Sequence, residues 1–286
     1  MKKVLLYSNP YWDKNFKMLR QAQKVLEAEG IECSVCLVFE VEQKSDLPED
    51  IRFCELEQGL RDAELLVCFG GDGTVLHASK AATRAGIPVL GVNIGNMGYL
   101  AEVDGSDLSC LKRLAYDDYF LERRMMLQVQ VHRDGELLFE DIALNDAVVS
   151  KSAIARTVHL SVSSDDQQPI VLSGDGVIVC TPTGSTAYCM SAGGPLVEPT
   201  ARCIVVTPIC SHDLMSKSFV LGAGRTVRVR SARPGRKTAY LSVDGGRPIR
   251  LLSSDTVTIR QSAYETQFLR MRDRSMFEII NAKFKK

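Results

Sequence analysis

The sequence lacks an excess of charge of either sign. Its 286 residues contain 35 lysines and arginines and 35 aspartates and glutamates, so the formal net charge is zero. Proteins that bind nucleic acid or an anionic membrane surface by electrostatic attraction carry a basic excess. We therefore expect neither nucleic acid nor a membrane as a partner.

The sequence also lacks a long hydrophobic run and a zinc-binding cysteine pattern. The apolar part of the first seven residues is too short for a signal peptide, and no stretch approaches the length of a membrane span. The nine cysteines are scattered. Cys33 and Cys36 have C-x-x-C spacing, but no second pair follows, which argues against structural zinc. Unpaired thiols are typical of a reducing compartment, so we expect a cytoplasmic protein.

The first part of the chain contains an alternation of strand and helix patterns. Apolar runs predict strands over 4–8, 31–39, 63–69 and 87–93, and apolar residues at helical spacing predict helices over 16–29 and 75–85. The acidic segment 45–57 predicts a loop with a short helix. Such alternation indicates a mostly parallel sheet with helices on both faces. We expect a Rossmann-like α/β domain over residues 1–104.

The pattern changes after a predicted helix over 106–116. The pair Asp134-Gly135 is typical of a hairpin turn between strands 127–132 and 137–142. Short strand-like runs with turn signals between them continue at 158–162, 170–172, 177–180, 203–208, 226–229, 239–243 and 256–260. This pattern predicts an all-β domain, a β-sandwich, over 105–269. The last residues, 276–286, predict a short amphipathic helix.

The stretch Gly70-Gly71-Asp72-Gly73-Thr74 joins a predicted buried strand to a predicted helix. Glycines at such a turn let the backbone approach a ligand, and the amides that open the helix favour phosphate. The Asp72 carboxylate can take a proton from an attacking hydroxyl or bear on a metal ion. The alternative is a glycine turn with a capping Asp. A second glycine-rich loop, 91–100, either lines the same cleft or is a plain connection.

Two further stretches carry polar groups in positions that suit a nucleotide. The Asn145 amide suits an adenine edge and the Asp146 carboxylate suits ribose hydroxyls, although such pairs are also common in turns. Residues 174–195 predict a strand, a Pro-Thr-Gly-Ser-Thr turn, a short helix and a Gly-Gly-Pro stop. Thr183, Ser185 and Thr186 crowd hydroxyls at a helix N-terminus, where they can cap the helix or bind a ligand. The density of small polar residues favours a binding surface.

Together these motifs resemble the NAD kinase family. The resemblance rests on Gly70–Thr74, Asn145-Asp146, Asp175-Gly176, the Thr-Pro-Thr-Gly-Ser-Thr-Ala-Tyr stretch at 181–188, and Gly193-Gly194-Pro195. Residues 207–214 and Val243-Asp244-Gly245 resemble two further landmarks of the family in the expected order. The first motif is shared with diacylglycerol and sphingoid-base kinases and, more loosely, with phosphofructokinases. The stretch 181–188 is much more specific to NAD kinases.

The resemblance implies phosphorylation of the 2′-hydroxyl of the adenosine ribose of NAD, with ATP or inorganic polyphosphate as donor, giving NADP. It implies a site between the two domains, a final segment (270–286) that packs back on the first domain, and a homodimer or homotetramer. Phosphoryl transfer needs neutralisation of the donor's charge, and the chain offers no zinc-like cluster, so Mg²⁺ is expected to arrive with ATP.

The resemblance also implies roles for individual residues. Asp72 would hold or deprotonate the 2′-hydroxyl. Asp244 would approach the reacting ribose. The remaining roles are a phosphate cradle made by Gly71, Gly73 and Thr74, adenosine binding by Asn145 and Asp146, and a pocket for the rest of NAD lined by Asp175, Thr183, Thr186, Ala187, Tyr188 and Ser191.

The sequence departs from the family at a few positions. The family often has Glu where Asp146 stands, Pro where Ser211 stands and Arg where Lys217 stands. Two alternatives to an NAD kinase remain open at this point. A lipid kinase shares the first glycine loop and would act on diacylglycerol or a sphingoid base. A non-catalytic dinucleotide sensor would bind NAD or NADP without ATP turnover, but the intact Asp72 argues against it.

Overall fold

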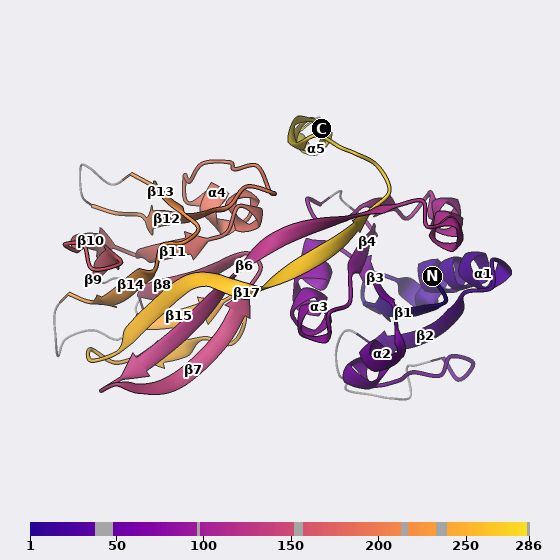
Figure 1. Cartoon of the computed structure of the whole chain (residues 1–286), viewed down its shortest axis with the longest axis horizontal. Coiled ribbons are helices and arrows are strands. Elements are labelled where there is room, and N and C mark those ends of the chain that lie inside the picture. Colours follow the sequence, from indigo (N-terminus) through magenta and orange to yellow (C-terminus); the bar gives the residue numbers. More distant parts are fainter. Residues whose placement is uncertain (38–47, 96–97, 152–156, 213–216, 233–238, 285–286) are drawn as a thin grey trace. The chain divides into compact units, whose positions relative to one another are not determined.

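The protein divides into two compact units, which are described separately (Figure 1). The structure, a computed structural model, describes residues 1–37, 48–95, 98–151, 157–212, 217–232 and 239–284. The first unit comprises Met1–Arg123 and Thr266–Lys286, and the second comprises Arg124–Glu265. The boundaries predicted from the sequence were at 104 and 269 instead. Residues after 104 belong to the first unit because Leu108, Leu111 and Leu114 are buried in its core.

The first unit is built on a parallel sheet in the spatial order β2, β1, β3, β4. Every pairing among these four strands is parallel, as is the pairing of β4 with the short β5. Buried apolar residues fill β3 along its whole length, as expected for a strand covered on both faces. The strands are β1 (Lys3–Ser8), β2 (Glu32–Leu37), β3 (Leu65–Gly70), β4 (Val89–Asn93) and β5 (Val103–Asp104).

Helices connect these parallel strands. In α1, Leu19, Ala22 and Leu26 recur at a spacing of three or four residues and are completely buried. Gly86 ends α3 in the left-handed conformation at φ 72°, and its amide bonds to the last turn. The helices are η1 (Lys14–Phe16), α1 (Lys17–Ala28), α2 (Leu56–Asp62), α3 (Asp72–Ala85), η3 (Leu108–Tyr116) and α5 (Met276–Phe284).

The end of the long strand β17 (Thr256–Arg270) also belongs to the first unit. Phe268 of β17 pairs in parallel with Val89 of β4 and is completely buried. The hydroxyls of Thr266 and Thr83 of α3 lie 2.8 Å apart. The segment therefore joins the sheet and contacts a helix of the first unit, although it is distant in sequence from both.

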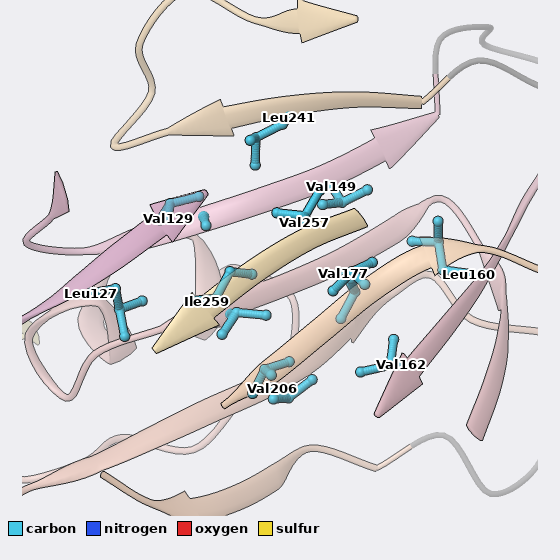
Figure 2. Close-up of a cluster of buried hydrophobic side chains, with 14 of the residues drawn as sticks. Leu127, Val129, Val149, Leu160, Val162, Val177, Val206, Leu241, Val257 and Ile259 are labelled. Atoms are coloured by element: carbon cyan, nitrogen blue, oxygen red, sulfur yellow. The ribbon is translucent and has the colours of Figure 1, made fainter. Parts of the chain in front are cut away.

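The second unit consists of two antiparallel sheets with one core between them (Figure 2). One sheet has the order β13, β12, β11, β8, β15, β16, and the other contains β10, β9, β14, β17, β6 and β7. Aliphatic side chains from both sheets, such as Val149 of β8 and Ile259 of β17, fill this core. The strands are β6 (Phe120–Arg133), β7 (Glu136–Ala143), β8 (Asp146–Lys151), β9 (Val158–Ser164), β10 (Ile170–Gly174), β11 (Gly176–Cys180), β12 (Cys203–Ile209), β13 (Phe219–Gly222), β14 (Val227–Ser231), β15 (Ala239–Val243) and β16 (Ile249–Leu251). Two short helices, η4 (Thr183–Thr186) and α4 (Tyr188–Ser191), follow β11.

The structure confirms the predicted fold class, an α/β domain followed by an all-β sandwich. The hairpin predicted at Asp134-Gly135 is present, with φ values of 51° and 88° that suit its two-residue turn. Several boundaries differ from the prediction. The helix after the glycine loop begins at Asp72 instead of residue 75, the helix predicted over 106–116 is the 3-10 helix η3, and the strands β5, β13 and β16 were not predicted.

Parts of five expectations lie outside the described residues, and four of them concern strands, loops or landmarks. They are the end of the strand predicted over 31–39, the start of the loop predicted over 45–57, part of the second glycine loop, and the end of the landmark 207–214. The last two residues of the C-terminal helix predicted over 276–286 lie outside them as well.

Candidate functional site

The first glycine loop lies at the carboxyl end of β3 and opens α3. The amides of Thr74 and Val75 both donate to the carbonyl of Gly71, which starts the helical hydrogen bonding. The amides of the residues before Thr74 have no preceding helical turn whose carbonyls they could bond to. The helix dipole adds partial positive charge at this end of α3. A side chain placed at Gly71 or Gly73 would meet no atom within 4 Å. The loop therefore presents amides with open space beside two of its glycines, an arrangement that can receive phosphate.

The Asp72 carboxylate is held by the second glycine-rich loop. Its Oδ2 accepts a hydrogen bond from the amide of Tyr99 at 2.8 Å, and its Oδ1 accepts one from the amide of Leu100 at 3.0 Å. A Cβ at Gly98 would lie 1.9 Å from Oδ1, so only glycine fits at that position. The second loop is thus more than a connection: its backbone fixes the orientation of the candidate catalytic carboxylate.

In the second unit, Asp244 holds the turn that carries Asn145 and Asp146. One carboxylate oxygen accepts the amides of Asn145 at 2.8 Å and Asp146 at 3.0 Å, and the other accepts the amide of Leu144 at 2.8 Å. Asp244 itself has a φ of 50°, a left-handed conformation that Asp and Asn tolerate better than most residues. The residue expected near the ribose therefore acts on the backbone of the two residues expected near the adenosine.

The Thr-Pro-Thr-Gly-Ser-Thr turn packs tightly against the same segment. The Thr181 amide donates to the carbonyl of Asn145 at 2.9 Å, and the Thr181 hydroxyl donates to the carbonyl of Leu144 at 2.5 Å. A Cβ at Gly184 would lie 2.2 Å from the carbonyl oxygen of Asn145. The two motifs, 35 to 40 residues apart in the sequence, therefore form one structural unit around Asn145.

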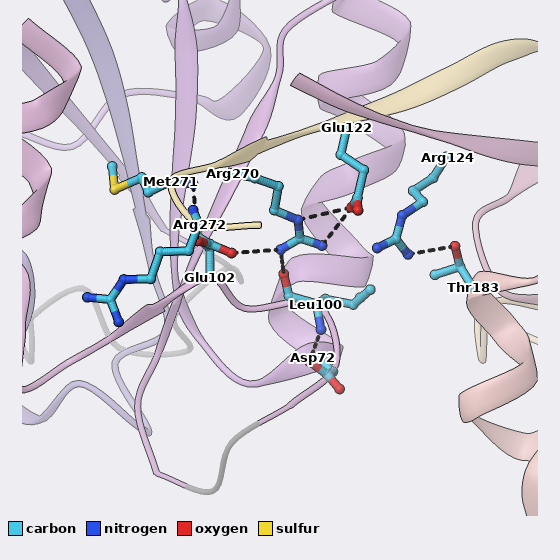
Figure 3. A network of polar contacts seen from close by, with 9 residues as sticks. All are labelled: Asp72, Leu100, Glu102, Glu122, Arg124, Thr183, Arg270, Met271 and Arg272. Carbon is cyan, nitrogen blue, oxygen red and sulfur yellow. Dashed lines mark hydrogen bonds and ion pairs between the residues drawn. The ribbon is translucent and has the colours of Figure 1, made fainter. Parts of the chain in front are cut away.

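The hydroxyls of this turn make hydrogen bonds within the protein. The buried Thr183 hydroxyl accepts a bond from the guanidinium of buried Arg124 at 3.1 Å (Figure 3). Ser185 donates to the carbonyl of Pro182 at 2.6 Å, and Thr186 donates to the carbonyl of Thr183 at 3.0 Å. These contacts are of the local side-chain-to-backbone kind that fixes a turn. They account for the crowding of hydroxyls that the sequence shows.

The carboxylates near this turn differ in their environment. Asp146 is almost completely buried, and burial raises the pKa of its carboxyl to about 7, with smaller contributions from the charges of Asp244 and Cys189. Asp175 is partly exposed and pairs with the Lys151 ammonium at 2.6 Å. Burial, followed by the charges of Cys210, Asp175 and Asp146, raises the pKa of the Tyr188 hydroxyl. The Tyr188 hydroxyl therefore feels the charges of both Asp146 and Asp175.

The remaining predicted residues border this cluster. Tyr188 begins α4 with 46% of its surface exposed, and Ser191 ends that helix on its exposed side. Ala187 is the residue before α4, with φ −104° and ψ −128°. The predicted site residues thus form two groups. Gly71, Asp72, Gly73 and Thr74 lie in the first unit, and Asn145, Asp146, Asp175, Thr183, Thr186, Ala187, Tyr188, Ser191 and Asp244 lie in the second.

Neither a membrane-spanning helix nor a preformed metal centre is found in the part of the chain that the structure describes. No helix there is long and apolar enough to cross a membrane. No group of three or more His, Cys, Asp or Glu side chains there is arranged to hold a metal ion.

Comparison with protein families assigns both halves of the chain. Residues 5–119 match the ATP-NAD kinase N-terminal domain, and residues 144–271 match the ATP-NAD kinase C-terminal domain. The chain belongs to the NAD kinase family. It is therefore an enzyme, a kinase that phosphorylates NAD.

Individual relatives agree with this assignment. The NAD kinase of Acetivibrio thermocellus is 41% identical over 222 residues, which cover 77% of each chain. The NAD kinase of Ruminiclostridium cellulolyticum is 31% identical over 285 residues, which cover 99% of this chain and 98% of the relative. These matches confirm the resemblance seen in the sequence. They also favour the NAD kinase interpretation over the lipid kinase and sensor alternatives.

Two solved structures share the fold. A yeast NADH kinase complexed with NADH superposes with a TM-score of 0.84 at 23% identity, covering 98% of this chain and 86% of the yeast chain. An NAD kinase from Archaeoglobus fulgidus in complex with ATP superposes with a TM-score of 0.74 at 24% identity, covering 99% of both chains. These likenesses support the two-domain fold.

The sequence analysis missed several residues that shape the site. The backbone amides of Tyr99 and Leu100 orient Asp72, and the residue types at these positions do not indicate this role. Arg124 and Arg270 are buried arginines within strands, at 3% and 6% exposure. A charge that interrupts an apolar run, as Arg270 does between Leu269 and Met271, is the signal that could have marked one of them, because buried charges need partners.

Proposed function

We propose that the chain transfers the terminal phosphoryl group of ATP to the 2′-hydroxyl of the adenosine ribose of NAD. The observation that carries this proposal is the Asp72 carboxylate in the first turn of α3, oriented by two backbone amides beside an open glycine loop. The loop suits the donor phosphates and the carboxylate suits the acceptor hydroxyl. Both components of phosphoryl transfer are therefore adjacent in the first unit.

Asp72 is proposed to orient the 2′-hydroxyl and accept its proton. Each carboxylate oxygen has two acceptor positions, and the Tyr99 and Leu100 amides each use one. A position on each oxygen can still accept a substrate hydroxyl. Because a ribose hydroxyl is a weak nucleophile at neutral pH, a positioned base is worth about 10²–10⁴ in rate. The two amide bonds fix the direction from which the base acts.

Gly71, Gly73 and Thr74 are proposed to cradle the donor phosphates together with the first amides of α3. Mg²⁺ is proposed as the cation that enters with ATP, and it would neutralise the charge of the transferring phosphoryl group. Inorganic polyphosphate is an alternative donor that the same amides could bind.

The NAD pocket is proposed to lie around the turn 144–146. Asn145 and Asp146 would bind the adenosine, and Asp175, Thr186, Ala187, Tyr188 and Ser191 would line the rest. Thr183 and Asp244 would contribute by holding this turn and its neighbour in place, since their polar atoms bond to Arg124 and to backbone amides. The pH dependence of Asp146 described below tests the electrostatics of this pocket.

We also propose a homodimer or homotetramer, which follows from the family and from the frequency of symmetric assemblies. The corner Gly193-Gly194-Pro195 and the neighbouring Tyr188 and Leu196, which are 46% and 40% exposed, are proposed to lie near a subunit boundary. Light scattering at assay concentration should report an oligomer. A fully active monomer would contradict this assignment.

The decisive experiment compares Asp72→Asn with Asp13→Asn in NADP formation from NAD and Mg-ATP. Asp13 is a matched control because its carboxylate also accepts two backbone amides, from Met18 at 2.8 Å and Leu19 at 3.0 Å, in the same unit. Asp13 is also buried and accepts the Ser8 hydroxyl at 3.1 Å, so Asp13→Asn should lose at least as much stability as Asp72→Asn. Only Asp72→Asn should lower turnover, by at least about 10²-fold, with a much smaller change in NAD affinity.

Each alternative has its own result. Near-normal turnover of folded Asp72→Asn would remove Asp72 from the catalytic role. A loss of NAD binding equal to the loss of rate would make it a binding residue. If the protein phosphorylates diacylglycerol and does not phosphorylate NAD, the proposed function is wrong. Parallel reactions with ATP and with polyphosphate identify the phosphoryl donor.

A further inference from the structure

Arg270, at the end of β17, is buried between two carboxylates (Figure 3). Its Nε donates to Glu122 at 3.0 Å, its Nη2 lies 3.0 Å from the same oxygen, and its Nη1 lies 3.6 Å from Glu102. The guanidinium also lies over the ring of Phe268, with its carbon 5.2 Å from the ring centre. Its position is thus fixed from several directions, and a planar fork of donors can satisfy them together.

The same guanidinium reaches the loop that orients Asp72. Nη1 of Arg270 donates to the carbonyl of Leu100 at 3.0 Å, and the amide of Leu100 donates to Asp72 at 3.0 Å. One residue therefore links the buried arginine to the candidate base through its own peptide groups. Glu102 extends this connection, because its Oε1 accepts the amides of Met271 at 3.1 Å and Arg272 at 3.0 Å.

We propose that Arg270 is a positioning residue for the kinase reaction. It fixes the Leu100 carbonyl and thereby the amides of Tyr99 and Leu100 that aim the Asp72 carboxylate. The inference rests on the proposed function of Asp72, from which Arg270 is separated by 198 positions in the sequence. A misplacement of about 1 Å at a reacting group can lower a rate about 10²-fold. Loss of the Arg270 contact should therefore lower turnover without removing any group that touches the substrate.

The test uses variants that separate positioning from folding. Arg270→Met alone would leave Glu102 buried without its cation, so it is combined with Glu102→Gln. The Gln carbonyl can still accept the two amides that now bond to Oε1. Glu102→Gln alone is the reference. Arg272→Gln is the matched control, because the Arg272 side chain is 57% exposed and pairs with Asp107 instead of the Leu100 loop.

We expect Arg270→Met with Glu102→Gln to lower kcat about 10–100-fold relative to Glu102→Gln, with KM for NAD changed less than about twofold. The amides of Tyr99 and Leu100 should exchange hydrogen faster in this variant and normally in Arg272→Gln. Arg270→Lys should show a partial loss, because an ammonium lacks the fork that spans Glu122 and Leu100. This variant retains the charge and serves as the test if the double variant does not fold.

A cycle with Asp72→Asn distinguishes positioning from a general structural role. Once the Asp72 carboxylate is absent, the Arg270 change should lower the remaining rate by less than about twofold. Three results would each overturn the proposal. They are losses of rate that multiply in the cycle, unchanged hydrogen exchange of the Tyr99 and Leu100 amides, and a kcat of the double variant close to that of Glu102→Gln. Full activity of Asp72→Asn would instead refute the proposed function, so the two failures are distinguishable.

Discussion

The electrostatics of the proposed NAD pocket can be tested at Asp146 by measuring how the free energy of unfolding depends on pH. The residue is 6% exposed, and burial raises the pKa of its carboxyl from the ordinary 3.8 to about 7. The unfolded chain releases this proton near pH 4, whereas the folded chain keeps it until about pH 7. The contribution of Asp146 to stability is therefore fully present below the unfolded pKa and is lost as pH rises toward the folded pKa. At about 1.4 kcal/mol for each pH unit, the full loss is about 4 kcal/mol.

The perturbation is Asp146→Asn, which removes the titration and keeps the shape of the side chain. Between about pH 5 and about pH 8, the wild-type protein should lose about 3 kcal/mol of unfolding free energy relative to the variant. Contributions from groups that are present in both proteins and do not interact with Asp146 cancel in this difference. Cys189 is the exception, because its charge contributes to the raised pKa of Asp146, and a hydrogen bond from Cys180 lowers the pKa of the Cys189 thiol. Repeating the comparison in a Cys189→Ala background removes that contribution.

The assay is urea denaturation at several pH values, followed by far-ultraviolet circular dichroism, which reports the helices and strands of both units. Trp12, the single tryptophan, lies in the first unit, so its fluorescence follows that unit separately. Asp165→Asn is the control, because bonds from the Thr226 amide and Arg225 lower the pKa of Asp165. It should titrate only in the acid range. Parallel stability curves for wild type and Asp146→Asn between pH 5 and 8 would refute the reasoning.

Three further predictions follow from the site. Gly98→Ala should lower kcat about 10²-fold in the NADP assay, because its Cβ would displace the Asp72 carboxylate; an unchanged rate would mean that the carboxylate position is not critical. Asp244→Asn should lower the free energy of unfolding in urea by about 1–3 kcal/mol and raise KM for NAD, because one of the amides of 144–146 loses its acceptor. Unchanged values in both measurements would contradict this prediction. EDTA should abolish activity and added Mg²⁺ should restore it, whereas tightly bound zinc found by metal analysis would contradict a cation that arrives with ATP.

The resemblance to the NAD kinase family predicted more about function than the local residue patterns did. Residue patterns allowed the hydroxyls of 183–186 either to cap the helix or to bind a ligand, and favoured a binding surface. The structure shows these hydroxyls bonded within the protein. The motif 181–188 nevertheless pointed to the correct family, because a whole turn and its spacing identify a fold segment even when its side chains serve structure.

The sequence by itself determined the elements that depend on local rules. Gly86 ends α3, Asp134-Gly135 forms the hairpin turn, and the apolar runs of the first 100 residues form parallel strands, because turn geometry and burial periodicity are written in adjacent residues. The strand β13 left no such signal, since its residues are mostly exposed and do not alternate. The three-residue β16 is too short to show a period.

Only the tertiary structure decided how the chemistry is arranged. The sequence places Asp72 in a glycine loop, but the amides that orient it come from residues 99–100, and the guanidinium that holds this loop comes from Arg270. In the same way Asp244 determines the shape of the turn 144–146 from a hundred residues away. Backbone amides are present at nearly every residue and so leave no mark in a sequence, and a partner for a buried charge can come from any part of the chain that the fold brings near it.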